Sequence, residues 1–157
     1  MKAEELFVGA LVRVNRDGLC IKKDTIVEVR GVDADDRLAG KGLVGGAHCR
    51  PLDENQFAGG IWCEYLDPIP LTPEILEKNG FDYEKTHDVW ILEYGEIVIE
   101  VGIYHPDFIN VSYKQITPDG NNEGNISNIC KVDGSDIMTH ELQHALRLCG
   151  IKKEIEL

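Results

Sequence analysis

Two prolines stand two residues apart near the middle of the chain, in the segment Asp-Pro-Ile-Pro-Leu at residues 67–71. Proline has no backbone N–H to donate, so two of them within three residues cannot continue a central strand of a sheet. The segment therefore predicts a boundary between residues 1–70 and residues 71–157. The two parts are expected to form two lobes or to pack into one compact unit.

The part before the prolines alternates short apolar runs with turn residues, a pattern typical of β-strands. In the run Ile-Val-Glu-Val-Arg-Gly-Val, Val27 and Val29 alternate with charged residues, as a half-solvated sheet requires. So many short strands in so few residues predict a small, strongly bent β-barrel. The strands are expected at residues 11–14, 25–32, 43–49 and 61–65.

The part after the prolines mixes helix and strand signals, so the fold class is α+β. Thr72 and Pro73 are typical of the cap and first position of a helix, which Gly80 ends. An antiparallel meander follows, and the odd-numbered residues of its middle strand are expected to be buried. The meander strands are expected at residues 89–94, 97–104 and 108–116.

A segment rich in Gly and Asn, at residues 117–128, is expected to be a loop that leads to the last helix. This helix is expected to begin at Ser135 or Asp136 and to end at Cys149, before Gly150. Its apolar residues cluster on one side, with Leu148 beside them. The opposite, polar side is expected to face water and carries His140, Gln143, His144 and Arg147.

The last helix also carries the string His-Glu-x-x-His, typical of zinc peptidases. His140 and His144 are four residues apart and project from one helix face, as two ligands of one zinc ion must, and Glu141 is then placed to activate zinc-bound water. A third ligand has no motif. It would come from Glu154 or Glu156, or from an upstream residue such as His105 or Asp107.

A second candidate ion site begins at Asp119. Residues 119–126 imitate the first eight positions of a calcium-binding loop, with oxygen-bearing side chains at positions one, three and five. The twelfth position, where a bidentate carboxylate belongs, is Cys130. A connecting loop without calcium is therefore the preferred interpretation of residues 119–130.

The composition is acidic, with 28 Asp and Glu against 16 Lys and Arg and a net charge of −12. A phosphate-binding surface would have to work against that charge, so we expect no nucleic-acid partner. Five cysteines without a paired spacing indicate reduced thiols. Because no apolar run is long enough to cross a membrane and the first residues lack an apolar signal core, we expect a cytoplasmic protein without membrane contact.

Three segments carry a family resemblance: residues 5–12 (Glu-Leu-Phe-Val-Gly-Ala-Leu-Val), residues 68–81 with the proline pair and a short helix ending in Gly-Phe, and residues 140–148 (His-Glu-Leu-Gln-His-Ala-Leu-Arg-Leu). In this order they resemble an uncharacterised family of small proteins encoded in phages and integrated mobile elements of gut bacteria. The resemblance implies a phage-related protein but no activity. It also implies a structural last helix, because the family pattern has neither the Glu nor the second His.

We therefore expect a non-catalytic accessory protein that binds another protein, of the host or of the phage, and that needs no cofactor. The alternative is a zinc-dependent, peptidase-like hydrolase. In that alternative His140 and His144 bind the zinc ion with Glu154 as the third ligand, and Glu141 is the general base.

Overall fold

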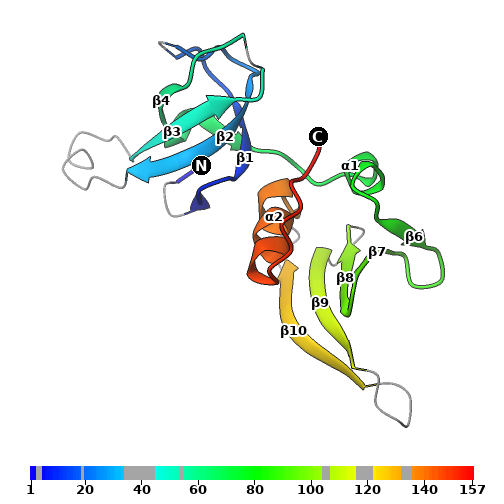
Figure 1. The fold of residues 1–157 in the computed structure, drawn as a ribbon. Helices are drawn as coiled ribbons and strands as arrows, with labels where there is room; N and C mark the ends of the chain where they lie inside the picture. The colour runs from blue at the N-terminus through cyan, green and yellow to red at the C-terminus, as the bar shows by residue number, and fades with distance from the viewer. Residues whose placement is uncertain are drawn as a thin grey trace. The chain divides into compact units, whose positions relative to one another are not determined.

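The structure is a computed structural model that describes residues 1–2, 5–18, 20–33, 45–53, 55–103, 107–115, 122–131 and 136–157 (Figure 1). The fold is α+β, with two antiparallel five-stranded sheets and a helix near the C-terminus. The chain forms two compact units, Met1–Ile69 and Pro70–Leu157, and each contains one of the sheets.

The first unit is built on a sheet with the strand order β4-β3-β2-β1-β5. Its strands are β1 (Leu11–Val14), β2 (Ile26–Asp33), β3 (Gly46–Pro51), β4 (Gly59–Trp62) and β5 (Leu66–Pro68). A short 3₁₀ helix, η3 (Cys63–Tyr65), connects β4 to β5. The prediction of one strand over residues 61–65 is therefore wrong after Trp62, because the chain turns there to form β5, which pairs with β1 at the other edge of the sheet.

Alternation along β1 and β2 builds the core of this unit. Val12, Val14, Val27 and Val29 are all fully buried, as the sequence pattern predicts for the two β2 residues. Within the described residues, β4 and β5 are the edge strands, and no pairing between them closes the sheet. The closed barrel predicted from the sequence is therefore not confirmed.

Pro68 and Pro70 lie at the edge of the first sheet and at the start of the second unit. At these positions the missing backbone N–H breaks no hydrogen bond of a central strand. Pro68 ends the edge strand β5. Pro70 forms an isolated bridge with Met138, and the next residue, Leu71, donates its N–H to the carbonyl of Ile137 at 2.9 Å. The chain therefore leaves the first sheet at one proline and enters the second unit at the other.

The second unit begins with the predicted short helix, α1 (Pro73–Lys78), whose cap is Thr72: its hydroxyl accepts from the N–H of Ile75 at 3.4 Å. Asn79 follows α1 and is 1% exposed. Its side-chain amide donates to the carbonyl of Glu156 at 2.8 Å and accepts from the N–H of Glu156 at 3.0 Å. One buried amide therefore holds the C-terminal residues against the end of α1.

The second sheet has the strand order β10-β9-β8-β7-β6. Its strands are β6 (Asp82–Glu84), β7 (Val89–Tyr94), β8 (Ile97–Gly102), β9 (Asp107–Gln115) and β10 (Asn122–Lys131). Ile99 and Val101 of β8 are fully buried, as predicted for the odd-numbered face, but Ile97 is only half-buried and the even-numbered Val98 is buried too. Figure 1 shows β7 to β10 side by side, with the last helix at the end of the sheet where β10 finishes.

Strand β10 corrects the prediction of a loop over residues 117–128. Residues 122–131 pair with β9 along its whole length, with a register shift between Asn125 and Ser127. Gly and Asn are poor strand formers, so their density favoured a loop, but β9 supplies a long partner strand and the shift absorbs the irregularity. Residues 117–121 lie outside the described residues.

The last helix, α2 (Thr139–Leu148), begins later than the sequence indicated. Asp136 lies before it and is exposed, Ser135 lies outside the described residues, and Met138 is the N-cap. The predicted end is confirmed, since Gly150 adopts a φ of +74° directly after the C-cap, a conformation that glycine accepts most readily. In the described part of the chain, neither helix has the length and apolarity needed to cross a membrane.

Candidate functional site

The two histidines of the His-Glu-x-x-His string occupy different environments on α2. His140 is 8% exposed and Gln143 is 3% exposed, whereas His144 is exposed. The prediction of a fully wet polar face is therefore wrong, and Leu148, expected beside the core, is 67% exposed. The side of α2 around Thr139 and Gln143 turns inward, which shows that polarity alone does not set the orientation of the helix.

Glu141, the candidate general base, caps its own helix. Its Oε2 accepts a hydrogen bond from the N–H of Met138 at 2.9 Å. A carboxylate in this position satisfies one of the free N–H groups of the first turn and interacts favourably with the helix dipole. The structure therefore gives Glu141 a role in beginning the helix.

Those candidate third ligands that the structure describes are not grouped with the histidines into a metal site. Glu154 is exposed and lies near Arg147 and Gly150, at the C-terminal end of α2. Asp107 is 6% exposed and accepts from the N–H of Ile137 at 3.2 Å. His105 lies outside the described residues. Among the residues that the structure does describe, no three His, Cys, Asp or Glu side chains are grouped so that they could hold a metal ion.

The candidate calcium loop does not keep a loop conformation. Residues 122–130 belong to β10 and are paired with β9, so positions four to twelve of the imitated loop are extended. A calcium loop must instead curl round the ion to bring its oxygens together. Asp119 and Asn121 lie outside the described residues.

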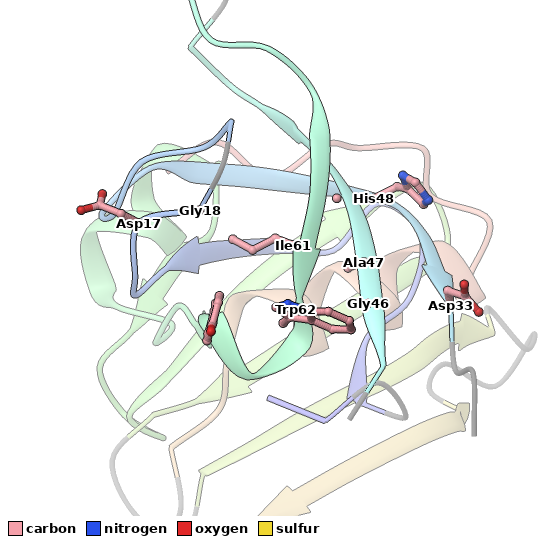
Figure 2. A pocket seen from close by; sticks show the side chains of 10 residues that line it. Asp17, Gly18, Asp33, Gly46, Ala47, His48, Ile61 and Trp62 are labelled. Carbon is pink, nitrogen blue, oxygen red and sulfur yellow. The ribbon is translucent and has the colours of Figure 1, made fainter. Parts of the chain in front are cut away.

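A pocket of about 570 Å³ opens in the first unit, whereas all of these candidates belong to the second unit (Figure 2). Its lining comes from five segments of the chain: the loop between β1 and β2, the strands β2, β3 and β4, and η3. The lining residues are Asp17, Gly18, Asp33, Gly46, Ala47, His48, Gly60, Ile61, Trp62 and Tyr65. In Figure 2, Ile61 and Trp62 lie between Asp17 on one side and Asp33 and His48 on the other.

Strand register explains how the pocket forms. Asp33 pairs with Gly46, and Gly46 pairs with Trp62, so these three residues form one row across β2, β3 and β4 on the same face of the sheet. His48 and Gly60 form another cross-strand pair on that face. Because Gly46 and Gly60 have no side chains, the surface of the sheet beside the Trp62 indole is open.

Neither Gly46 nor Gly60 is required by the backbone conformation or by close packing. A Cβ on Gly60 would meet no atom within 4 Å, and one on Gly46 would have only the carbonyl oxygen of Ile61 at 3.8 Å. The neighbouring Gly59 differs, since its Cβ would lie 3.2 Å from the Cβ of Cys20. Gly46 and Gly60 therefore leave open space on the surface of the sheet, whereas Gly59 allows close packing.

Hydrogen bonds within the loop between β1 and β2 hold Asp17 in place. Asp17 Oδ1 accepts from the N–H of Lys23 at 2.9 Å, and the N–H of Gly18 donates to the carbonyl of Ile21 at 2.8 Å. These bonds fix the turn and keep the Asp17 carboxylate at the edge of the pocket.

The aromatic wall already contacts a cation. The guanidinium of Arg16 lies 5.0 Å from the centroid of the Tyr65 ring, a cation–π distance, and its Nη1 donates to the Tyr65 hydroxyl at 3.5 Å. Arg16 itself is not among the residues that line the pocket. The side of the pocket formed by Tyr65 is thus suited to both apolar and cationic groups.

Sequence reasoning missed this site. Asp33, Gly46, Trp62 and Tyr65 belong to no functional motif in the sequence. The available signal was an aromatic residue and small or acidic residues near strand ends, but their pairing depends on contacts between segments far apart in the chain. Only the register reveals that they share a face.

The core of the same unit contains two buried thiols. Cys49 is 1% exposed and Cys63 is fully buried. Burial, with a smaller effect of Cys63, raises the pKa of Cys49 to about 12, and burial also raises the pKa of Cys63. These thiols therefore pack as small apolar groups and are poor nucleophiles.

Comparisons with protein-family models, curated proteins and solved structures find no significant match to the chain. The resemblance to phage and mobile-element proteins therefore stays a prediction.

Proposed function

We propose that the chain is a non-catalytic binding protein, and that its first unit holds a short segment of a partner protein in the pocket beside Trp62. The observation that carries this proposal is a bare sheet surface, left by Gly46 and Gly60, with an indole and a phenol at its edge. Aromatic side chains beside an open surface are the usual anchors of protein recognition, because they bury a large area at little entropic cost.

The size and shape of the pocket support a peptide ligand. About 570 Å³ lies within the range of sites that take a small ligand or a few side chains. The pocket lies on a sheet surface, which an extended segment can cross. The net charge of −12 and the two carboxylates at its edges work against a phosphate-bearing ligand, so a protein segment is favoured over a nucleic acid.

The titratable side chains of the pocket also favour binding over catalysis. Asp17 lies on the side opposite Asp33 and His48 (Figure 2). Two carboxylates that work together as acid and base act on one reacting atom from close by, whereas Asp17 and Asp33 lie on opposite sides of the pocket. Here the carboxylates lie at the rim, where they attract a ligand.

The proposal can be tested by selecting ligands for the full-length protein from a displayed library of random peptides. We expect enriched peptides to bind the parent protein and to lose at least about tenfold in affinity for Trp62→Ala, since an aromatic anchor is typically worth that much or more. Because Trp62→Ala removes a large, half-buried side chain, Gly60→Val serves as a second variant: its side chain occupies the open space of the pocket and removes nothing.

The matched control is Tyr94→Ala, which removes an aromatic side chain that is 55% exposed in the second unit. We expect it to bind the selected peptides as the parent does. The proposal fails if no peptide is enriched, or if the enriched peptides bind Trp62→Ala and Gly60→Val as tightly as they bind the parent.

A further inference from the structure

The row formed by Asp33, Gly46 and Trp62 has the dimensions of a slot for one planar group. Neighbouring strands lie about 4.8 Å apart, so the backbones of Asp33 and Trp62 are about 10 Å apart, with Gly46 between them. In Figure 2 these three residues follow one another across the pocket. The register therefore puts an acidic residue and an indole on the same face of the sheet, two strands apart, with a position that has no side chain between them.

The charges around this slot favour a cation. Asp33 and Asp17 both line the pocket, and the nearby Arg16 lies on the Tyr65 ring. Two carboxylates and one guanidinium leave an excess of negative charge around the slot. The whole chain, at −12, adds a long-range attraction for basic segments.

We propose that the partner segment inserts an arginine side chain into this slot, with its guanidinium stacked on Trp62 and paired with the Asp33 carboxylate. This inference rests on the proposed function and names the chemistry that the pocket selects. Asp17, on the opposite side, contributes longer-range attraction and does not pair with the same guanidinium.

Arginine fits this slot better than the other candidate side chains. A guanidinium is planar, so it can stack on an aromatic face and pair with a carboxylate in its own plane at the same time. Lysine offers a more strongly hydrated point charge that cannot do both. The contact of Arg16 with Tyr65 shows that an aromatic ring of this pocket already accepts a guanidinium on its face.

The two tryptophans of the chain make a direct test possible. Trp62 lines the pocket, whereas Trp90 lies in the second unit and is 4% exposed. Full-length protein labelled with 5-fluorotryptophan should give two ¹⁹F resonances, and Trp62→Phe identifies the one from the pocket. Trp90 then reports on any effect that is not local to the pocket.

The probes are the N-acetyl, N-methylamide derivatives of arginine, lysine and citrulline, titrated separately. Citrulline keeps the shape of arginine but carries no charge. We expect the arginine probe to shift the Trp62 resonance alone and to bind about fivefold or more tightly than the citrulline probe, with lysine between them. Asp33→Asn should remove most of this preference, and Asp17→Asn should reduce it less.

Three results would overturn the inference: equal binding of arginine and citrulline, an undiminished arginine preference in Asp33→Asn, or equal shifts of both tryptophan resonances. The peptides selected by display separate this failure from that of the proposed function. If they bind through Trp62 but tolerate citrulline in place of arginine, the cation slot is wrong and the peptide site stands. If none depends on Trp62, the proposed function fails as well.

Discussion

Trp62 of β4 is paired directly with Gly46 of β3, so its indole stands beside a strand position that carries no side chain. The pocket of the first unit exists because of this pairing and the similar bare position at Gly60. Its formation requires no unusual backbone and no cavity in the core. A surface of this kind can be filled by a single substitution, which makes the account easy to test.

Two glycines should respond oppositely to substitution. Gly60→Val places a β-branched side chain in open space on a strand, so the free energy of unfolding should stay unchanged or rise by up to about 1 kcal/mol. Gly102→Ala should lower it by about 1–3 kcal/mol, because the new Cβ would overlap the Phe108 ring. Urea denaturation followed by circular dichroism measures both, and equal losses would contradict the placement of Gly60.

The two histidines of α2 should differ in their effect on stability. His140 is 8% exposed, so His140→Ala should lower the free energy of unfolding by about 1–3 kcal/mol, whereas His144→Ala, at an exposed position, should change it by less than about 0.5 kcal/mol. A structural zinc ion held by both residues would make the two losses similar. Elemental analysis that found one zinc ion per chain, lost in either variant, would contradict this interpretation of the helix.

Thiol reactivity should follow burial. With the pKa of Cys49 raised to about 12, only about one Cys49 in ten thousand is a thiolate at pH 8, and its side chain is 1% exposed. Cys20 is exposed. A short pulse of iodoacetamide should therefore label Cys20 in the native protein and reach Cys49 and Cys63 only in urea, as peptide mass spectrometry would show. Rapid native labelling of Cys49 would refute the buried placement.

Glu84 should make the free energy of unfolding depend on pH in the acid range. Hydrogen bonds from Thr86, and then from His87, lower the pKa of its carboxyl from 4.5 to about 2. Because the pKa is lower in the folded state, the contribution is complete above about pH 4.5 and is lost as the pH falls towards 2. Glu84→Gln should thus show a flatter loss of stability than the parent over this range.

The titration of the Glu84 side-chain carbon, followed by NMR, gives the midpoint directly. Glu96→Gln, at the exposed turn between β7 and β8, controls for the removal of one surface charge. A Glu84 midpoint near 4.5, or identical pH profiles for Glu84→Gln and the parent, would argue against the hydrogen-bonded turn.

Local signals in the sequence predicted much of the fold. The Thr-Pro start of α1, the alternation in β2 and the glycine after α2 each depend on neighbouring residues, and each is confirmed. Strand β10 could not be predicted in the same way, because its stability comes from pairing with β9 rather than from its own composition. Tertiary pairing thus overrode weak local propensity.

The candidate sites show the same limit. A spacing of four residues fixes the angle between His140 and His144 on α2, but it does not determine which of them faces the interior. The row of Asp33, Gly46 and Trp62 joins positions that are 13 to 29 residues apart in sequence, so no local pattern reveals it. The His-Glu-x-x-His motif offered a zinc site on α2, where the structure shows a packed helix. The pocket depends on strand register, which no motif encodes.

The central claim is that the first unit binds a protein segment at the pocket beside Trp62, and chemical-shift mapping tests it most directly. A peptide selected by display is titrated into ¹⁵N-labelled full-length protein, and the same titration is repeated with Gly60→Val. We predict that the shifted amides cluster among the pocket residues from Asp17 to Tyr65, and that Gly60→Val, folded as the parent is, shows almost none of these shifts. Shifts centred on α2 or the second sheet, or unchanged binding by Gly60→Val, would contradict the account.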